Sequence, residues 1–301
     1  MTEIVDAHQV PFGVLLRRWR GRRQLTQTDL ALSVESSTRH LSCLETGKAQ
    51  PSREMVTRLA EYLDVPLRDR NTLLLSAGYA PAFTERSLEA LDAAKAAMDR
   101  ILSAHRPFPA FAVDRHWNVI LSNGALPQLY EGCSPDLLRA GANAMRLVLH
   151  PDGMGSRIVN FGAWRAHSQN VLQRQLQTRA DPVTSALLAE ISAYPVPPGA
   201  EPYRGLDTAE HLAMPLRIAT RFGVVSLLNT TTVFGTPNDV TLAEVALEML
   251  FPADDATADI VKRMVNESAS LDTLGRSPSV SRRPRGWWLR SSPPQSAADR
   301  G

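Results

Sequence analysis

The stretch over residues 25–48 constrains this chain most, because it predicts two short helices joined by a very tight turn. Thr26 is a good N-cap for the first helix, and Asp29 three residues later can complete a capping-box-like pair. Leu41 and Leu44 are expected to point inward from the second helix. Helices connected in this way pack together and present the outer face of the second one, which fits a DNA major groove.

The helical pattern extends over residues 12–79, which read as five short helices. An apolar stripe on the first helix is formed by Phe12, Leu15, Leu16 and Trp19. Ser52 is the expected N-cap of the fourth helix, and Pro81 closes the segment. The arginine run that begins at Arg17 is either a solvated helix face or a patch that faces phosphate. We therefore predict an all-α N-terminal domain over residues 1–81.

The outer face of the second short helix needs small or polar residues if it is to reach base edges. The residues of this kind are Ser37, Thr38, Arg39, His40, Ser42 and Cys43. Arg39 is the first choice for base readout, since a guanidinium can bond the O6 and N7 atoms of guanine; a salt bridge or phosphate contact is the alternative. We expect His40 to contact phosphate or the neighbouring turn, and Cys43 to pack against a thymine methyl or to fill space. Glu45 is expected to be a structural partner for helix-end donors.

This segment resembles the helix-turn-helix of the xenobiotic-response-element (XRE) family, which is similar to the lambda and 434 repressors. The shared motifs are Leu25-Thr26-Gln27, Leu30-Ala31, Glu45-Thr46-Gly47-Lys48 and Pro51-Ser52. The resemblance implies that Gln27 contacts a phosphate and buttresses the recognition helix. It also implies DNA contacts for Thr38, Arg39 and Cys43, and we add Lys48 of the third motif. The turn glycine of the family is Glu35 here, so we expect this turn to be strained or differently shaped.

The rest of the chain reads as a helical connection over residues 82–106 and an α+β domain over residues 107–265. Its strands are predicted at 110–113, 119–122, 211–219 and 223–234, and its helices at 123–130, 136–149, 155–179, 182–193, 241–250 and 256–265. Residues 266–301 contain too little apolar surface to fold and are predicted to be disordered. In that tail, Trp287 and Trp288 either dock on a partner or on the protein body, or have no selected role.

The second domain resembles the ligand-binding domain of MmyB-like regulators, which has a PAS-like fold. The matching stretches are Phe108-Pro109-Ala110, Val113–Val119, Arg157–Phe161, Phe234–Glu244 and Phe251–Asp254. Phe161 departs from the pattern, where we expect tryptophan. The resemblance implies a small-molecule effector, a fatty acid or another apolar acid.

An apolar pocket can form where helices cover one face of a sheet. The residues expected to line it are Phe111, Trp117, Phe161, Trp164, Met214 and Leu228, with plain core packing as the alternative. We expect Arg157 and Asn160 to hold an anionic head group, or else to make helix–sheet hydrogen bonds.

Composition sets further limits on the class of protein. The 301 residues carry a net charge of +2 and two cysteines, and they contain neither a signal-peptide pattern nor an apolar run long enough to span a membrane. These features predict a cytoplasmic protein. Zinc motifs, phosphate-binding loops, dinucleotide fingerprints and nucleophile elbows are absent from the sequence, so we expect neither an enzyme nor a cofactor.

Three functions remain open. The first is a DNA-binding transcriptional regulator that binds a double-stranded operator as a homodimer, since paired half-sites add specificity, and that responds to an effector. In the second, the C-terminal domain binds only protein, as a dimerisation or recruitment surface. The third is a repressor that cleaves its own Ala140-Gly141 bond with a Ser226–Lys262 pair. This function is disfavoured, because Lys262 falls on a predicted surface helix rather than on a strand beside Ser226.

Overall fold

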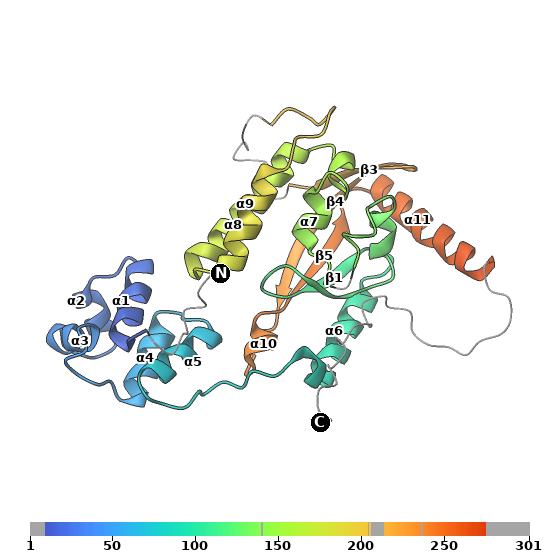
Figure 1. Cartoon of the computed structure of the whole chain (residues 1–301). Helices are drawn as coiled ribbons and strands as arrows, with labels where there is room; N and C mark the ends of the chain where they lie inside the picture. The colour runs from blue at the N-terminus through green and yellow to red at the C-terminus, as the bar shows by residue number, and fades with distance from the viewer. Residues whose placement is uncertain (1–9, 140, 204, 206–213, 236, 275–301) are drawn as a thin grey trace, which may run out of the picture. The chain divides into compact units, whose positions relative to one another are not determined.

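The computed structural model describes residues 10–139, 141–203, 205, 214–235 and 237–274, which form two compact units (Figure 1). The N-terminal unit runs to Asp92 and also includes the later segment Phe234–Glu244. The C-terminal unit comprises Ala93–Val233 and the chain from Val245 onward. A segment deep in the second half of the sequence therefore packs with the N-terminal helices, which the sequence did not predict.

The N-terminal unit is all-helical, as expected. Its helices are α1 (Phe12–Arg22), α2 (Gln27–Ser33), α3 (Thr38–Glu45), α4 (Arg53–Tyr62), α5 (Leu67–Ser76), the 3-10 helix η2 (Leu88–Ala90) and α10 (Val240–Ala243). The expected capping box at α2 is confirmed, since Thr26 accepts a bond from the Asp29 N–H and Asp29 accepts one from the Thr26 N–H. Ser37 and Ser52 cap α3 and α4 by accepting bonds from the N–H groups of His40 and Met55. These caps fix where each short helix begins.

The C-terminal unit is built on one five-stranded antiparallel sheet in the order β2-β1-β5-β4-β3. The strands are β1 (Ala110–Val113), β2 (Val119–Ser122), β3 (Leu216–Thr220), β4 (Gly223–Val233) and β5 (Ala246–Pro252). This arrangement is the α+β architecture that the sequence predicted.

The helices of this unit are α6, η3, α7, η4, α8, α9 and α11. Their bounds are α6 (Asp92–Ala104), η3 (Leu126–Tyr130), α7 (Ala144–Leu149), η4 (Gly155–Arg157), α8 (Phe161–Thr178), α9 (Pro182–Ala193) and α11 (Asp255–Leu274). The helices α8 and α9 lie side by side, α7 packs against both, and α11 packs along β4 and β5 (Figure 1). One core joins η3, α7, α8 and the inner face of the sheet, and Phe161 and Leu172 are fully buried in it.

Several sequence predictions are corrected by the structure. The helix expected over 136–149 is only α7, because Asn143 caps that helix and the preceding described residues form turns. The helix expected over 155–179 is divided into η4 and α8.

The helix expected over 241–250 is only the short α10 followed by β5, which lies at the centre of the sheet. Alanine, leucine, glutamate and methionine favour a helix locally, but pairing with β1 and β4 on both sides overrides that preference. The disorder expected from Asn266 is wrong for residues 266–274, which belong to α11. The remainder of the predicted tail lies outside the described residues. Trp287 and Trp288 lie outside the described residues.

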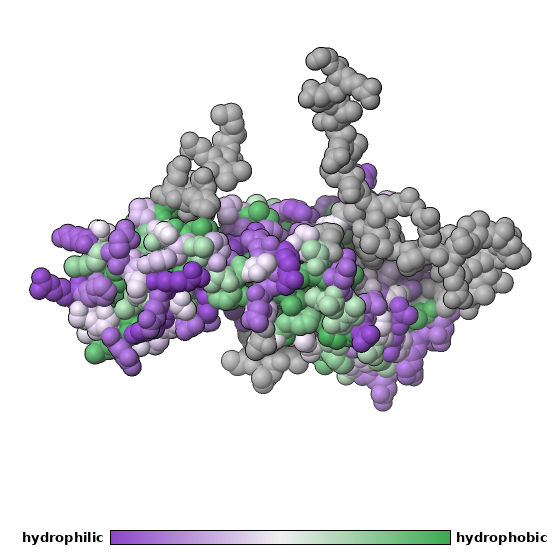
Figure 2. All heavy atoms as spheres, turned by 90° about the horizontal axis from the view of Figure 1, so that it is seen from below, coloured by the Kyte–Doolittle hydropathy of each residue, from purple (hydrophilic) through white to green (hydrophobic). Residues whose placement is uncertain are grey.

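The visible surface carries polar side chains with small apolar patches among them (Figure 2). Some large apolar side chains are well exposed, among them Leu32 on α2 and Phe251 on β5. In the part of the chain that the structure describes, no helix is both long and apolar enough to cross a membrane.

Candidate functional site

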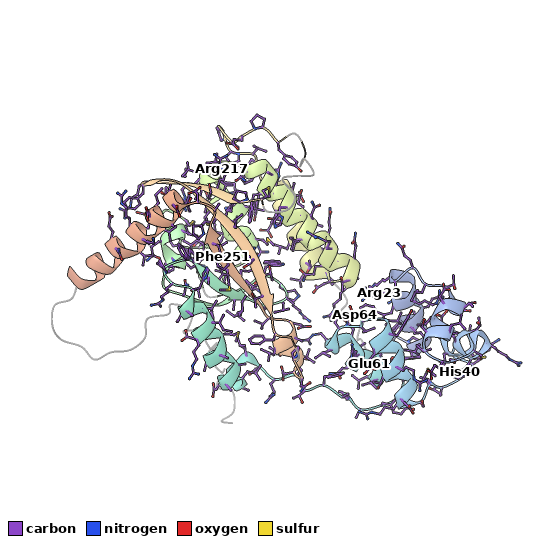
Figure 3. All side chains as sticks on the ribbon, turned by 180° about the vertical axis from the view of Figure 1, so that it is seen from behind. Arg23, His40, Glu61, Asp64, Arg217 and Phe251 are labelled. Atoms are coloured by element: carbon purple, nitrogen blue, oxygen red, sulfur yellow. The ribbon has the colours of Figure 1, made fainter. Side chains whose placement is uncertain are left out.

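The outer face of α3 carries the residues expected to contact DNA. Ser37, Thr38, Arg39 and Lys48 are exposed, and His40, Ser42 and Cys43 are half-buried. Leu41 and Leu44 are buried on the opposite side, as expected. Within the described residues Arg39 makes no ion pair, so the salt-bridge alternative has no partner there. Figure 3 shows His40 on this helix, away from the contact between Arg23 and Asp64.

Glu45, the last residue of α3, joins three helices of the N-terminal unit. The residue is only 4% exposed. Arg20 of α1 donates to both carboxylate oxygens, from Nε at 2.6 Å and from Nη2 at 3.0 Å. The Nε2 atom of Gln27 on α2 donates to Oε2 at 2.8 Å, and Arg17 lies 3.6 Å away. Glu45 is thus a structural residue, but its donors are side chains of other helices rather than helix-end groups.

The charge of Glu45 is compensated by this network. Burial by itself would raise the pKa of Glu45, but the hydrogen bonds from Arg20 and Gln27 and the arginine charges lower it below its ordinary value. The side chain of Gln27 is therefore directed at Glu45, and it links α2 to the end of α3. These bonds hold α3 in a fixed orientation against α1 and α2.

Two further features shape the helix-turn-helix. A Cβ atom on Gly13 of α1 would lie 2.5 Å from the carbonyl oxygens of Leu44 and Glu45, so only glycine allows this close approach to α3. Glu35, in the turn between α2 and α3, has a φ of 53°, the left-handed region that glycine adopts more readily. The turn therefore has a conformation that glycine would adopt at a lower cost than glutamate.

The arginine run on α1 is divided between packing and solvent. Arg23 donates from Nε to the carbonyl of Leu63 at 2.8 Å and from Nη2 to that of Asp64 at 2.7 Å, which ties α1 to the end of α4 (Figure 3). Arg17 and Arg18 are exposed. Arg17 also lies 3.6 Å from Glu45, so part of the run contributes to the charge balance of that residue.

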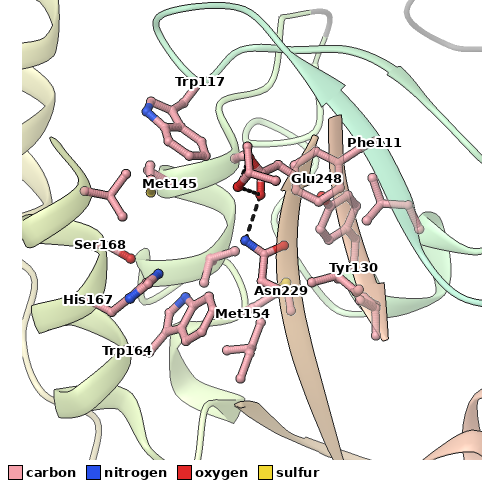
Figure 4. Close-up of a pocket in the computed structure, with 18 of the residues that line it drawn as sticks. Phe111, Trp117, Tyr130, Met145, Met154, Trp164, His167, Ser168, Asn229 and Glu248 are labelled. Carbon is pink, nitrogen blue, oxygen red and sulfur yellow. Dashed lines mark hydrogen bonds between the residues drawn. The ribbon is translucent and has the colours of Figure 1, made fainter. Parts of the chain in front are cut away.

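The C-terminal unit contains a cavity of about 280 Å³ between the inner face of the sheet and the helices η3, α7 and α8 (Figure 4). Most of its lining is apolar, and it includes Phe111, Trp117, Leu126, Tyr130, Met145, Trp164 and Leu250. A cavity with mostly apolar walls and a few polar groups is the usual form of a small-molecule site.

The sheet wall of the cavity carries a buried glutamate. Glu248 on β5 is 1% exposed, and it accepts hydrogen bonds from Asn229 Nδ2 at 2.7 Å and from the Thr231 hydroxyl at 3.1 Å, both on β4. Burial raises the pKa of Glu248, and these two bonds only partly offset that effect. The Oδ1 atom of Asn229 is buried and has no hydrogen-bond partner within the described chain.

The helical wall of the cavity carries cationic and aromatic groups from α8. The ring of His167 stacks on that of Trp164 with a centroid distance of 5.0 Å. Burial lowers the pKa of His167, and the nearby Arg174 lowers it further. The imidazole is therefore neutral at neutral pH, and Arg174 supplies the positive charge on this side.

The residues that we predicted to bind a ligand divide into two groups. Phe111, Trp117 and Trp164 line the cavity. The other five, which lie elsewhere in the unit, are Arg157, Asn160, Phe161, Met214 and Leu228. Arg157 donates to the Leu129 carbonyl at 2.7 Å. Asn160 bonds the Pro215 carbonyl at 2.8 Å and the Arg217 N–H at 3.1 Å, so it makes the helix–sheet bonds that were its alternative.

The remaining three pack without facing the cavity. Phe161 is fully buried in the core, and Met214 packs against it. Leu228 lies on the face of β4 opposite to Asn229, because side chains alternate along a strand. The polar cavity residues Asn229, Thr231 and Glu248 were not predicted. The signal available for Glu248 was a lone acid inside the apolar run Leu247–Leu250.

The groups proposed for self-cleavage do not form a recognisable dyad. Lys262 lies on α11, where it is exposed and pairs with Asp259 at 3.4 Å, while Ser226 lies on β4 and its N–H bonds Thr257. Ala140 lies outside the described residues.

Comparison with known proteins identifies both units. Residues 94–264 match the MmyB-like transcription regulator ligand binding domain, and residues 11–73 match a helix-turn-helix domain. The chain therefore belongs to the family of MmyB-like transcription regulators. It is a helix-turn-helix DNA-binding regulator with a ligand-binding domain, and these are families of transcription regulators rather than of enzymes.

Comparisons with curated proteins and with solved structures leave this family assignment unchanged. No curated protein matches this chain. Among solved structures, the chain is similar to an RNA-binding light-oxygen-voltage receptor at 10% identity and a TM-score of 0.24, with 87% of this chain and 65% of that chain covered. The chain thus spans slightly less than two thirds of that protein.

Proposed function

We propose that this protein binds a specific double-stranded DNA operator with α3 in the major groove, and that a small apolar or fatty-acid-like molecule in the cavity controls its affinity. The observation that carries the proposal is the largely apolar cavity of about 280 Å³ in a chain that also presents a recognition helix. The working form would be a homodimer on paired half-sites. Since its target is DNA, we place it in the cytoplasm. The proposed division is a DNA-binding domain over 1–81, a connection over 82–106, a ligand-binding domain over 107–265 and a tail from 266.

The proposed DNA contacts follow from exposure on α3 and its flanks. Arg39 would read a guanine, because its guanidinium is exposed and unpaired within the described residues. Phosphate or other base contacts are proposed for the remaining predicted residues, which are Gln27, Ser37, Thr38, His40, Ser42, Cys43 and Lys48. Gln27 would have to contact DNA while its amide group bonds Glu45.

The proposed route of control is the segment Phe234–Glu244, which joins β4 to β5. Both strands carry the polar cavity residues, while the segment itself packs in the N-terminal unit. Arg68 of α5 binds both carboxylate oxygens of Glu244 at 2.8 and 2.9 Å. Arg86 pairs with Asp239 at 3.1 Å. A ligand that moved β4 and β5 would thereby bias the helical unit.

The experiment for DNA binding is selection of duplexes from a random pool, followed by titration of the best one. We expect Arg39→Ala to weaken binding by roughly 1–3 kcal/mol, the range for a bidentate base contact. Arg100→Ala, an exposed arginine on α6, is the matched control and should change affinity little. Unchanged affinity in Arg39→Ala would contradict the assigned role, and failure to select any duplex would contradict specific DNA binding.

The competing function is a C-terminal domain that only mediates dimerisation or recruitment. Val224, Leu228 and Phe251 favour it, because they lie on the sheet face opposite to the cavity and are half-buried or exposed. A stable dimer whose melting temperature responds to no apolar molecule would support this alternative. A ligand that raises the melting temperature would support the sensor.

A further inference from the structure

The sheet wall of the cavity is rich in hydrogen-bond acceptors and short of donors. The carboxylate of Glu248 has about four lone-pair sites, and it receives one bond from Asn229 Nδ2 and one from the Thr231 hydroxyl. The Oδ1 atom of Asn229 receives none within the described chain. Buried polar atoms are nearly always satisfied, and an exception in a cavity points to a missing partner.

Glu248 forms no ion pair with any of the described residues, although the cavity also contains Arg174 and His167 on α8. Phe111 lies directly opposite Glu248 on β1 in the sheet register, and Thr231 lies opposite on β4. Figure 4 shows Asn229 and Glu248 side by side on the sheet wall, across the cavity from His167 and Ser168. A buried acid without a cation is costly unless a ligand supplies the missing donor.

We propose that this wall selects the head group of the effector: an apolar molecule with a hydrogen-bond donor, an amine or a hydroxyl, that bonds the Glu248 carboxyl and the Oδ1 atom of Asn229. The inference rests on the proposed function, because it assigns the polar end of the effector proposed there. A bare carboxylate at this wall would face two groups of acceptors and would be repelled. An apolar chain attached to the donor would fill the space between Phe111, Trp117 and Trp164.

The test compares three probes that share one ten-carbon chain and differ only in head group: decylamine, decanol and decanoate. Each is titrated calorimetrically into the full chain at neutral pH, below its micelle concentration. We expect decylamine and decanol to bind at least about tenfold more tightly than decanoate, since a hydrogen bond to a charged group is worth roughly 1.5–3 kcal/mol.

Two variants locate the effect. Glu248→Gln should weaken the binding of decylamine by about tenfold and the binding of decanol much less, because glutamine keeps an acceptor oxygen but loses the charge. Asn229→Ala should weaken the binding of both decylamine and decanol. Glu267→Gln, an exposed glutamate on α11, is the control and should leave all three affinities unchanged.

The outcomes separate this inference from the proposed function. Equal binding of all three probes would overturn the donor preference and leave the apolar sensor standing. Tightest binding of decanoate would also overturn it, and would favour a simple fatty acid. Failure of every probe to bind would overturn both the inference and the apolar effector. A preference for the donors that survives in Glu248→Gln and in Asn229→Ala would place their head groups elsewhere and contradict the assignment.

Discussion

Each unit of this protein buries a glutamate, and the two are treated in opposite ways. Glu45 at the end of α3 is surrounded by Arg20, Gln27 and Arg17, and these groups lower its pKa. Among the described residues, Glu248 in the cavity is bonded by the amide of Asn229 and the hydroxyl of Thr231, and burial raises its pKa. Both residues are almost inaccessible to solvent, 4% and 1% exposed, and their pKa values are shifted in opposite directions.

The difference shows how a structural charge can be told from a functional one. A buried charge that is fully paired holds elements together, as Glu45 does for α1, α2 and α3. A buried charge left short of donors destabilises the empty fold, and it is kept where a ligand completes it. The predictions below test each half of this comparison.

The largest effect is expected when the network around Glu45 is broken. Glu45→Ala leaves Arg20 without its partner, with 17% of that side chain exposed, so we expect a loss of about 3 kcal/mol of unfolding free energy. Urea unfolding of the full chain measures it. Glu54→Ala is the control, because the Glu54 side chain is 83% exposed in its pair with Arg58 and should change stability by under about 1 kcal/mol. Similar losses of unfolding free energy in both variants would show that the Glu45 network contributes no more to stability than an exposed ion pair.

The next effect tests the close contact of α1 with the end of α3. Gly13→Ala places a methyl group 2.5 Å from two backbone oxygens, so we expect a loss of roughly 1–3 kcal/mol despite the better helix propensity of alanine. Gly21→Ala on the same helix meets nothing within 4 Å and should gain up to about 1 kcal/mol. Urea unfolding distinguishes the two. A gain in both would mean that α1 and α3 are not packed as described.

A smaller effect of opposite sign is expected at Glu248. Burial raises the pKa of Glu248 in the folded chain above its unfolded value of about 4.5. The protonated carboxyl therefore stabilises the fold below pH 4.5, and this contribution is lost as the pH rises through the folded pKa. Glu248→Gln should therefore stabilise the ligand-free chain by on the order of 1 kcal/mol at neutral pH. The gain should vanish as the pH approaches 4.5. Thermal melts across this range measure it, and a destabilised variant at neutral pH would contradict an uncompensated charge.

The smallest effect is expected for the route of control. Arg68→Ala removes the bidentate contact with Glu244. We expect DNA affinity and probe binding to change little, while the effect of a bound probe on DNA affinity decreases. Titrating the selected duplex with and without decylamine measures this coupling, which is typically 1–3 kcal/mol in allosteric proteins. Full coupling in the variant would exclude this contact as the route.

Sequence reasoning succeeded where structure is set locally. The strands β1 and β2 and the helix α9 begin and end at the predicted residues, since turn residues and the N-cap Asp181 mark them. The α3 face followed from a motif with fixed spacing. The strand β5 was missed because its residues favour a helix until β1 and β4 pair with them. Glu248, Asn229 and Thr231 come together only through that pairing, so the polar end of the cavity could not be predicted.

The most direct test follows the two carboxyl groups in one experiment. The side-chain carboxyl carbons of glutamate are labelled with carbon-13 and titrated by NMR, with Glu45→Gln and Glu248→Gln used for assignment. We predict that Glu45 titrates below the ordinary glutamate pKa and is indifferent to decylamine, whereas Glu248 titrates above it and shifts when decylamine is added. Equal titration of the two groups, or a response to decylamine at Glu45 and not at Glu248, would contradict the assignment of one charge to the fold and the other to the ligand.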